Sequence, residues 1–218
     1  VWANENSREA IYAAMLRRET FGTTGPQIKV RFFGGWGFEA DDVVSPELVA
    51  RGYAVGVPMG GTLKGKSKKK GPPSFLVWAT KDANSGNLDR IQIIKGWVDP
   101  SGARHEKIYN ITWSGKRKLN AEGELPAVGN TVDAAKASYT NTIGAAELSA
   151  VWTDPDFDRK LHAFYYARVL EIPTPRWSTY DAVKLGIDIP GELPATIQER
   201  AYTSPIWYRP KSKKVAKD

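Results

Sequence analysis

The chain has 218 residues, a formal net charge of +7 and no cysteine. This length suits one large domain, or one domain with part of a second. The absence of cysteine excludes disulfides, thiolate metal sites and cysteine nucleophiles. No run of about 18 apolar residues is present, so the sequence predicts no membrane-spanning helix.

The excess positive charge is confined to two stretches. Nine of the 31 basic residues lie in the loop from Lys64 to Lys70 and in the tail from Lys211. The other 22 are balanced by 24 acidic residues, so the rest of the chain is close to neutral. Both stretches have the composition of solvated segments. A nucleic-acid-binding surface more often places its cations on a folded face among aromatic residues. We therefore favour a solvated loop and a basic flexible tail over a phosphate-contacting patch.

Residues 6–22, NSREAIYAAMLRRETFG, predict an α-helix with marked ends. Asn6 can cap its first turn, with Glu9 three residues later to complete a capping box. Gly22 can end it in a left-handed conformation. The apolar stripe of this helix consists of Ile11, Ala14 and Met15.

From Gln27 onward the hydrophobic period changes to two, which is typical of strands. In QIKVRFF, for example, Ile28, Val30 and Phe32 share one face. Such runs occupy residues 27–33, 74–80, 89–97, 107–113, 147–152, 164–172 and 204–208. Shorter helical patterns occur at 45–54 and 177–186. Many short strands without intervening helices predict a mainly β fold, an antiparallel β-sandwich preceded by one α-helix.

The sequence TDPDFDR offers one candidate metal site, because Asp154, Asp156 and Asp158 alternate as calcium ligands can. The glycine and the downstream bidentate glutamate of a calcium loop are absent. A turn at Pro155, in which the aspartates bond local backbone amides, is the favoured alternative.

The remaining polar residues do not assemble a catalytic centre. His105 and His162 show no metal-ligand spacing, and each is interpreted as an exposed loop histidine. No serine stands in a nucleophile elbow. Arg168 lies in a strand that otherwise looks buried, so we expect a carboxylate partner, either Glu171 or an aspartate of another strand.

Several long segments together resemble the domain-of-unknown-function family 3604, a bacterial family similar to polymerase-and-histidinol-phosphatase (PHP) type metal-dependent hydrolases. The similarity covers nearly the whole chain apart from the lysine loop and the tail. The segments that carry it are VWANENSREAIYAAMLRRETFGTTGPQIKVRFFGGW, GVPMGG, NLDRIQIIKGWVD, YTNTIGAAELSAVWTDPDFD, FYYARVLEIPTPRWSTYDA and LPATIQERAYTSPIWY.

The resemblance implies three parts. Residues 1–26 would be the last helix and turn of an upstream PHP-like α/β barrel, residues 27–210 its C-terminal β-sandwich, and residues 211–218 a tail. The family's ligand phrases, such as D-L-H-x-H-T and T-D-H, do not occur in this chain. Divalent metal ions are therefore expected in the barrel before Val1, and no cofactor in this chain. The barrel portion of the same parent protein is the expected partner, and many family members look exported, which implies a periplasmic location.

The loop of Thr23, Thr24 and Gly25 leads out of the barrel in this scheme. It could border the mouth of the active site and hold an anionic group, helped by Arg17 or Arg18. The favoured alternative is a hinge, in which Gly25 before Pro26 sets the direction of the next strand.

Three functions follow from these observations. The first is the sandwich portion of a hydrolase acting on phosphate or another ester, with a structural and substrate-entrance role and no catalytic residue of its own. The second is a non-catalytic module that binds a glycan or another ligand through a solvent-facing row of aromatics, for instance Trp36, Trp97 and Trp177. The third is a nucleic-acid partner that uses the lysine segments.

Overall fold

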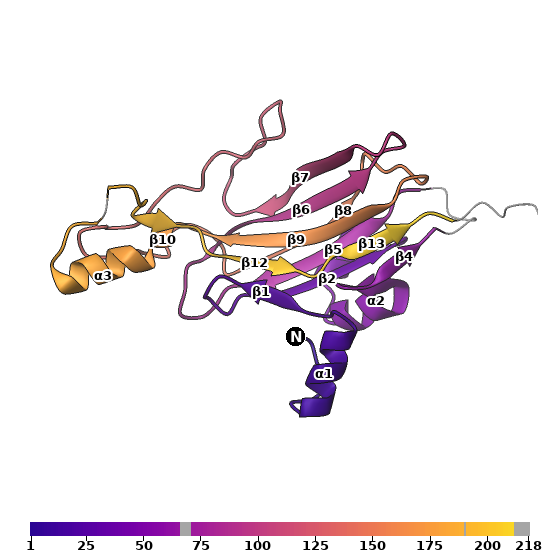
Figure 1. Cartoon of the computed structure of the whole chain (residues 1–218), viewed down its shortest axis with the longest axis horizontal. Helices are drawn as coiled ribbons and strands as arrows, with labels where there is room; N and C mark the ends of the chain where they lie inside the picture. The colour runs from indigo at the N-terminus through magenta and orange to yellow at the C-terminus, as the bar shows by residue number, and fades with distance from the viewer. Residues whose placement is uncertain (66–70, 190, 212–218) are drawn as a thin grey trace, which may run out of the picture.

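Strands make up most of the regular structure in the computed structural model, which describes residues 1–65, 71–189 and 191–211 (Figure 1). Two sheets face each other, and one helix and a small sheet extend from one end. The lysine loop from residue 66 to 70 and the tail from residue 212 lie outside the described residues. The predictions made for those two segments therefore stay predictions.

The smaller of the two facing sheets has four antiparallel strands in the order β3-β2-β5-β8. The strands are β2 (Lys29–Gly35), β3 (Gly56–Pro58), β5 (Ser74–Thr80) and β8 (Glu147–Thr153). The sequence pattern predicts that β2 ends at Phe33. The observed strand continues through Gly34 and Gly35 because both glycines pair with β3 on one side and with β5 on the other.

The larger sheet has seven strands and is centred on β9 (Ala163–Glu171). β9 pairs with β6 along one side and with β12 and β13 along the other. The outer strands follow: β7 pairs with β6, β1 with β12, and β4 with β13. All its pairs are antiparallel except that of β4 with β13. The bounds are β1 (Phe21–Thr23), β4 (Thr62–Lys64), β6 (Leu88–Val98), β7 (Arg104–Trp113), β12 (Arg200–Thr203) and β13 (Ile206–Arg209).

The two sheets bury a common core between them. Val30 and Phe32 of β2 belong to one buried cluster with Tyr165 and Ala167 of β9. Alternate residues of each strand thus point inward, as the period of two predicts. The prediction of a mainly β fold with antiparallel sheets is confirmed, and a core shared by two facing sheets is what a β-sandwich requires.

The helices lie around this pair of sheets. α2 covers β2, where Leu48 packs in a buried cluster with Phe33, Phe38 and Leu76. α3 projects from one end of the sandwich together with a two-stranded sheet, and we call this projection the arm (Figure 1). The helical elements are α1 (Arg8–Leu16), the 3₁₀-helix η1 (Ala40–Val43), α2 (Leu48–Val55) and α3 (Trp177–Leu185). The small sheet pairs β10 (Thr174–Pro175) with β11 (Thr196–Ile197).

Both predicted ends of the first helix need correction. Ser7, not Asn6, is the N-cap, because its backbone is extended and its Oγ accepts a hydrogen bond from the Ala10 amide. The helix ends at Leu16, well before Gly22, which lies inside β1. The left-handed residue that reverses the chain is Arg18, with φ of 59°.

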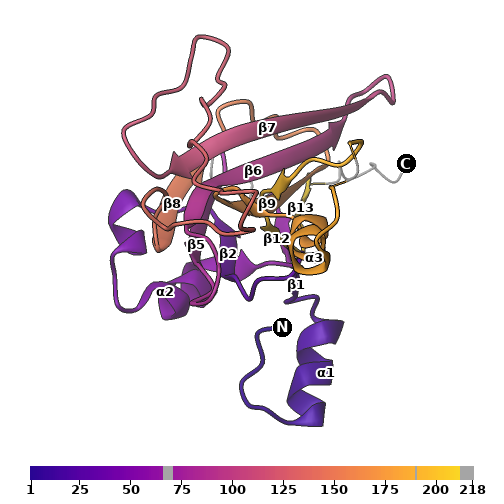
Figure 2. The ribbon, with the colours of Figure 1, turned by 90° about the vertical axis from the view of Figure 1, so that its left-hand side faces the viewer.

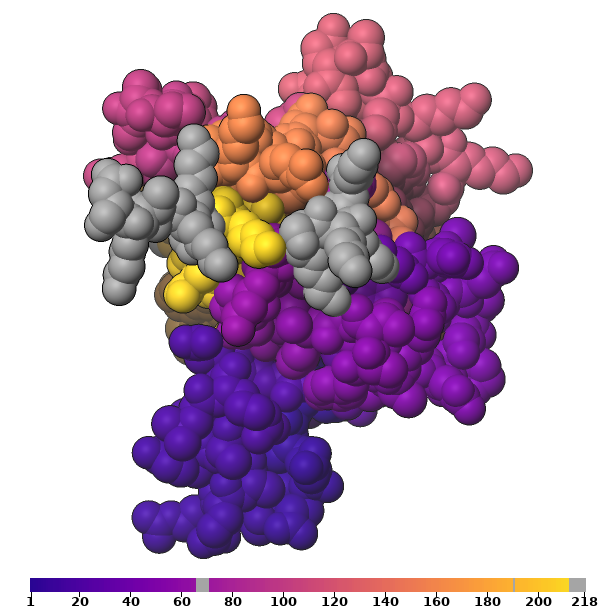
Figure 3. Space-filling model, turned by 90° about the vertical axis from the view of Figure 1, so that its right-hand side faces the viewer, coloured from indigo at the N-terminus to yellow at the C-terminus, as the bar shows by residue number. Residues whose placement is uncertain are grey.

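Helix α1 stands away from the sandwich (Figures 1 and 2). In the space-filling view it forms a lobe that projects from the rest of the molecule (Figure 3). Ala14 is its only buried residue, whereas Tyr12, Met15 and Leu16 are 62%, 55% and 65% exposed. Of the predicted apolar stripe, Ala14 is buried, Ile11 is half-buried and Met15 is exposed. The apolar residues of α1 without cover in the described chain are therefore Tyr12, Met15 and Leu16.

Two expectations for single polar residues also need correction. Arg168 lies on the outer face of β9 and donates from Nε and Nη2 to Oε1 of Gln92, at 2.9 and 2.7 Å, rather than to a carboxylate. His105 and His162 are exposed as expected, but His105 lies inside β7 rather than in a loop.

A buried ion pair joins the core to the turn that follows β8. Lys95 Nζ lies 2.6 Å from Asp154 Oδ2, and both side chains are almost completely inaccessible to solvent. The Tyr165 hydroxyl donates to the same carboxylate at 2.7 Å, and Lys95 also donates to the Asp156 carbonyl at 2.7 Å. Because every group in this set has a partner, the charges are tolerated inside the protein.

We expect Asp154→Asn to lower the free energy of unfolding by about 3 kcal/mol, because it leaves the Lys95 ammonium buried without a counter-charge. Urea denaturation of the two proteins measures this difference. Asp133→Asn is the matched control, since Asp133 pairs with the exposed Lys136, and its loss should stay below about 0.5 kcal/mol. Equal losses in the two variants would contradict this account of the core.

Candidate functional site

The Thr-Thr-Gly segment is hydrogen-bonded to β12. Thr23 ends β1 opposite Ala201. The Thr24 amide donates to the Arg200 carbonyl at 3.0 Å, and its hydroxyl accepts from the Arg200 amide at 3.0 Å. The same hydroxyl donates to the Glu199 carboxylate. The Thr24 hydroxyl, which the alternative of an anion site would use, is thus engaged within the protein.

Arg18 is held at the other end of β1. Its amide donates to the Met15 carbonyl and the Glu19 amide to the Ala14 carbonyl, which closes the helix with the two bonds of a Schellman motif. Its Nε donates to the Gly60 carbonyl at 3.2 Å. A Cβ at Gly60 would lie 2.3 Å from the Arg18 carbonyl oxygen, so the two segments touch closely. The structure therefore does not bring Arg18 and the Thr23–Gly25 turn into one site.

Four side chains form what we call the N-terminal clamp: Trp2, Glu19, Arg31 and Tyr53. Trp2 Nε1 donates to the Val30 carbonyl at 2.8 Å, and the Arg31 guanidinium lies 3.4 Å from the centre of the Trp2 ring. The Trp2 amide donates to the Glu19 carbonyl at 3.1 Å. These contacts tie both sides of α1 to the sandwich, because Trp2 precedes the helix and Glu19 follows it.

The carboxylate of Glu19 completes the clamp from inside. Glu19 is buried and accepts a hydrogen bond from the Tyr53 hydroxyl of α2. Burial, with this hydrogen bond and the negative charge of Glu19, raises the pKa of Tyr53 to about 12. Burial also lowers the pKa of Arg31. Of the four clamp residues only Glu19 is buried, and a buried carboxylate that is paired in this way holds one geometry.

The three aspartates of TDPDFDR make separate contacts. Asp154 accepts from the Asp156 amide and Asp158 from the Lys160 amide, at 2.9 and 2.8 Å, as in the local-turn alternative. The Asp156 carboxylate accepts from Lys107 Nζ and the Tyr109 hydroxyl, and these hydrogen bonds lower its pKa. The sequence could not show that lysines from β6 and β7 reach these carboxylates.

Within residues 1–65, 71–189 and 191–211, no group of three or more histidine, aspartate or glutamate side chains is arranged to hold a metal ion. In the same part of the chain, no helix is long and apolar enough to cross a membrane.

A buried carboxyl group lies where the arm leaves the sandwich. Glu171, the last residue of β9, is fully buried; its Oε2 accepts from the Ser85 hydroxyl at 2.6 Å and its Oε1 has no hydrogen-bond partner. Burial raises the pKa of this carboxyl to about 7. The acidic groups Asp82 and Glu199 add to this shift, and the Tyr139 hydroxyl is also close by. The sequence contains a signal for this buried carboxyl, because the alternating pattern of inward apolar residues in β9 ends at a charged residue, Glu171.

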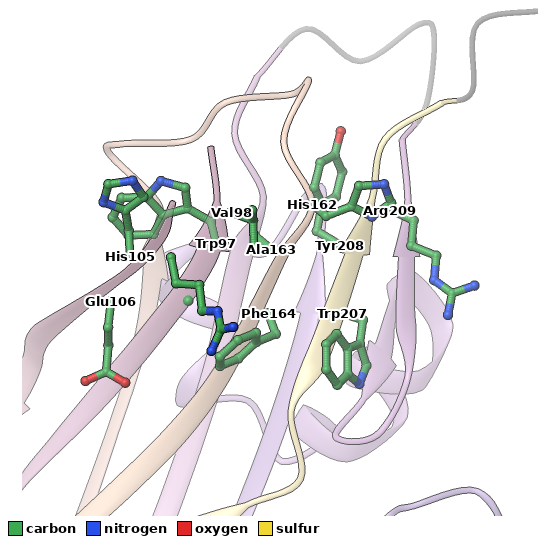
Figure 4. Close-up of a pocket in the computed structure, with 12 residues that line it drawn as sticks. Trp97, Val98, His105, Glu106, His162, Ala163, Phe164, Trp207, Tyr208 and Arg209 are labelled. Atoms are coloured by element: carbon green, nitrogen blue, oxygen red, sulfur yellow. The ribbon is translucent and has the colours of Figure 1, made fainter. Parts of the chain in front are cut away.

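A groove on the outer face of the larger sheet has the size and lining of a ligand site (Figure 4). Its volume is about 710 Å³, within the range of small-molecule sites. Phe164 of β9 and Trp207 of β13 lie side by side on its floor, with ring centres 5.5 Å apart. At one end Trp97 stacks on His105 at 5.1 Å, and His105 Nε2 is 2.8 Å from Asp99 Oδ2. Arg104, Glu106 and Arg209 also line the groove.

The three tryptophans expected in one row are dispersed. Trp36 packs against Phe157 and Tyr208 beside the core. Trp97 lines the groove, and Trp177 is 65% exposed on α3, in the arm. Of the three, only Trp97 belongs to the groove. Phe164 and Trp207 were missed because a strand pattern does not show which outward aromatics become neighbours.

Comparison with known proteins gives one finding. The sequence model of the family described as "Protein of unknown function (DUF3604)" matches residues 1–210. No curated protein and no solved structure matches the chain.

Glu171 gives a pH-dependent prediction. Its folded pKa of about 7 exceeds the ordinary 4.5, so its stabilising contribution is complete below pH 4.5 and is lost as the pH rises through 7. Between pH 5 and pH 8 the wild-type free energy of unfolding should fall relative to Glu171→Gln by on the order of 2 kcal/mol. Urea denaturation of the wild type and of Glu171→Gln at both pH values measures this difference.

The control for this comparison is Glu147→Gln, since Glu147 is exposed on β8. Its pH dependence should run parallel to that of the wild type. If Glu171→Gln also runs parallel to the wild type, the buried carboxyl is not the titrating group.

Proposed function

The chain belongs to the DUF3604 family, and we propose that it forms the C-terminal β-sandwich portion of a bacterial, exported, PHP-like metal-dependent hydrolase. In this proposal α1 packs against a preceding catalytic barrel of the same protein. The substrate class is a phosphate ester or another ester, as the family resemblance implies.

The position of α1 is the observation that supports this proposal. The N-terminal clamp fixes the helix at both ends, yet Tyr12, Met15 and Leu16 remain exposed. Burying one large apolar side chain contributes about 1.5–3 kcal/mol. A helix whose two ends are fixed in position, with such residues outward, is suited to a partner that covers them.

The assignment of roles follows from what the side chains can do. The described residues gather no set of carboxylates or imidazoles that fits a divalent metal ion. As the family resemblance implies, the proposal assigns the metal site to the preceding barrel and a structural role to this chain. The Thr23–Gly25 turn lies at the other end of β1 from α1, so this proposal requires the barrel to extend along β1 for its substrate entrance to reach the turn.

One experiment compares the isolated chain with the longer protein. We expect Met15→Gln combined with Leu16→Gln to change the stability of residues 1–218 by less than about 0.5 kcal/mol, because both side chains are already exposed. In the longer protein the same double substitution should lower the free energy of unfolding by about 2–4 kcal/mol, because an apolar contact is lost. Thermal and urea denaturation of both proteins measure the difference.

The matched control replaces two exposed aliphatic residues elsewhere, Val44→Gln with Leu185→Gln. It should be neutral in the isolated chain and milder than the α1 pair in the longer protein. The same small effect of the α1 pair in both proteins would contradict docking through this helix.

A second experiment addresses the chemistry. The longer protein should hydrolyse phosphoesters such as p-nitrophenyl phosphate, lose this activity with a chelator, and regain it with zinc or manganese. Residues 1–218 alone should show neither activity nor stoichiometric metal. Tight binding of zinc or manganese by the isolated chain would overturn the placement of the metal site.

A further inference from the structure

The floor of the outer-face groove is built from three strands at one level of the sheet. Gly96 of β6 is paired with Phe164 of β9, and Phe164 is paired with Trp207 of β13. Residues paired across neighbouring strands point to the same face. Glycine, phenylalanine and tryptophan therefore stand in one row on the outside of the sheet.

Gly96 is what makes this floor flat. A Cβ at this position would lie 2.2 Å from the Phe164 ring, so the ring rests directly on the glycine backbone. Any larger residue would lift Phe164 away from the sheet. The row thus offers two aromatic surfaces with open space above them rather than a ridge of side chains.

Trp207 is 42% exposed, so a large part of its indole is open to solvent although it also packs on Phe164. An aromatic surface left open to water costs free energy that a ligand regains when it stacks there. Trp207 packs on Phe164 and projects from a strand that pairs on both sides, so its orientation is set before any ligand arrives. Such preorganisation reduces the entropy lost on binding.

The rim of the groove is polar. Arg104 and Glu106 come from β7, on one side of the floor, and Arg209 comes from β13, on the other. All three side chains are exposed, and none forms a hydrogen bond or ion pair within the described residues. Donors and an acceptor are therefore available on both sides of an apolar floor.

This combination suits a ring with one apolar face and a polar edge. A pyranose has such a shape, because its C–H groups lie on its faces and its hydroxyls project around its edge. A single-stranded nucleic acid would also stack, and Arg104 and Arg209 would attract its phosphates, so it is the competing ligand that a binding experiment must separate from a sugar. An aliphatic peptide would leave the charged rim without partners.

We propose that this groove binds a glycan, with a pyranose ring stacked on Phe164 and Trp207 and its hydroxyls hydrogen-bonded to Arg104, Glu106 and Arg209. The proposal does not rest on the hydrolase assignment, because it uses only residues on the outer face of the sandwich. A glycan bound here would hold this protein, and any portion joined to it, on a carbohydrate surface.

Isothermal titration of residues 1–218 with four hexasaccharides tests the proposal: those of β-1,4-glucose, β-1,4-N-acetylglucosamine, α-1,4-glucose and α-1,4-galacturonate. We expect saturable binding of at least one. Trp207→Ala should weaken that binding at least about tenfold, since stacking carries much of the affinity. Trp177→Ala is the matched control, because Trp177 is exposed but lies in the arm, and it should bind within about twofold of wild type.

A second variant guards against a folding defect in Trp207→Ala. Glu106→Gln with Arg209→Ala changes only exposed side chains and should weaken binding by about three- to tenfold. Failure of all four sugars to bind, or wild-type affinity in Trp207→Ala, would overturn the proposal. So would tighter binding of a thymidine dodecamer than of any of the sugars.

Discussion

The way in which Trp2 is held decides where helix α1 can lie. The indole of Trp2 donates to a carbonyl of the core strand β2 and lies under the guanidinium of Arg31. The Trp2 amide also donates to the carbonyl of Glu19, so the segment that contains α1 forms a closed loop. A helix tied at both ends in this way is held beside the sandwich rather than packed on it. Its apolar residues Tyr12, Met15 and Leu16 are therefore left without cover in the described chain.

The turn after α1 adds to this constraint. A non-glycine residue in the left-handed region, here Arg18, costs free energy and persists only where its surroundings fix it. Those surroundings are the two bonds that close the helix, the bond from Arg18 to Gly60, and the close approach of the Gly60 backbone. From this turn the chain enters β1 and the larger sheet, so the direction of α1 is linked to the register of the sandwich.

Strand β9 connects the interior of the protein to its outer face. Its inward residue Tyr165 meets the buried pair of Lys95 and Asp154, while its outward neighbour Phe164 forms the floor of the groove. Because side chains alternate, a shift of one residue in the pairing of β9 would exchange these two sets. The same strand ends at Glu171, where a buried carboxyl faces the root of the arm.

Period and composition predict the long strands well and the contacts between them poorly. The run at 74–80 coincides with β5, and the helical patterns at 45–54 and 177–186 contain most of α2 and α3. Several strands of two to four residues, such as β1 and β12, were missed, because their pairing comes from partners far along the chain. The four-residue β13 falls mostly within the predicted run at 204–208. The same limit hid Gln92 as the partner of Arg168, and Phe164 as the neighbour of both Gly96 and Trp207. Asn6 and Ser7 are equally good caps by type, and only the backbone decides between them.

Hydrogen–deuterium exchange across residues 8–17 tests the central claim, that α1 is a docking element, most directly. In the isolated chain these amides should exchange quickly, since a short helix without cover opens readily. In the longer protein the same amides should be protected at least about 100-fold more, because opening the helix would also break its apolar contact. Equal protection in the two proteins would show that α1 is stable without a partner and would contradict the account.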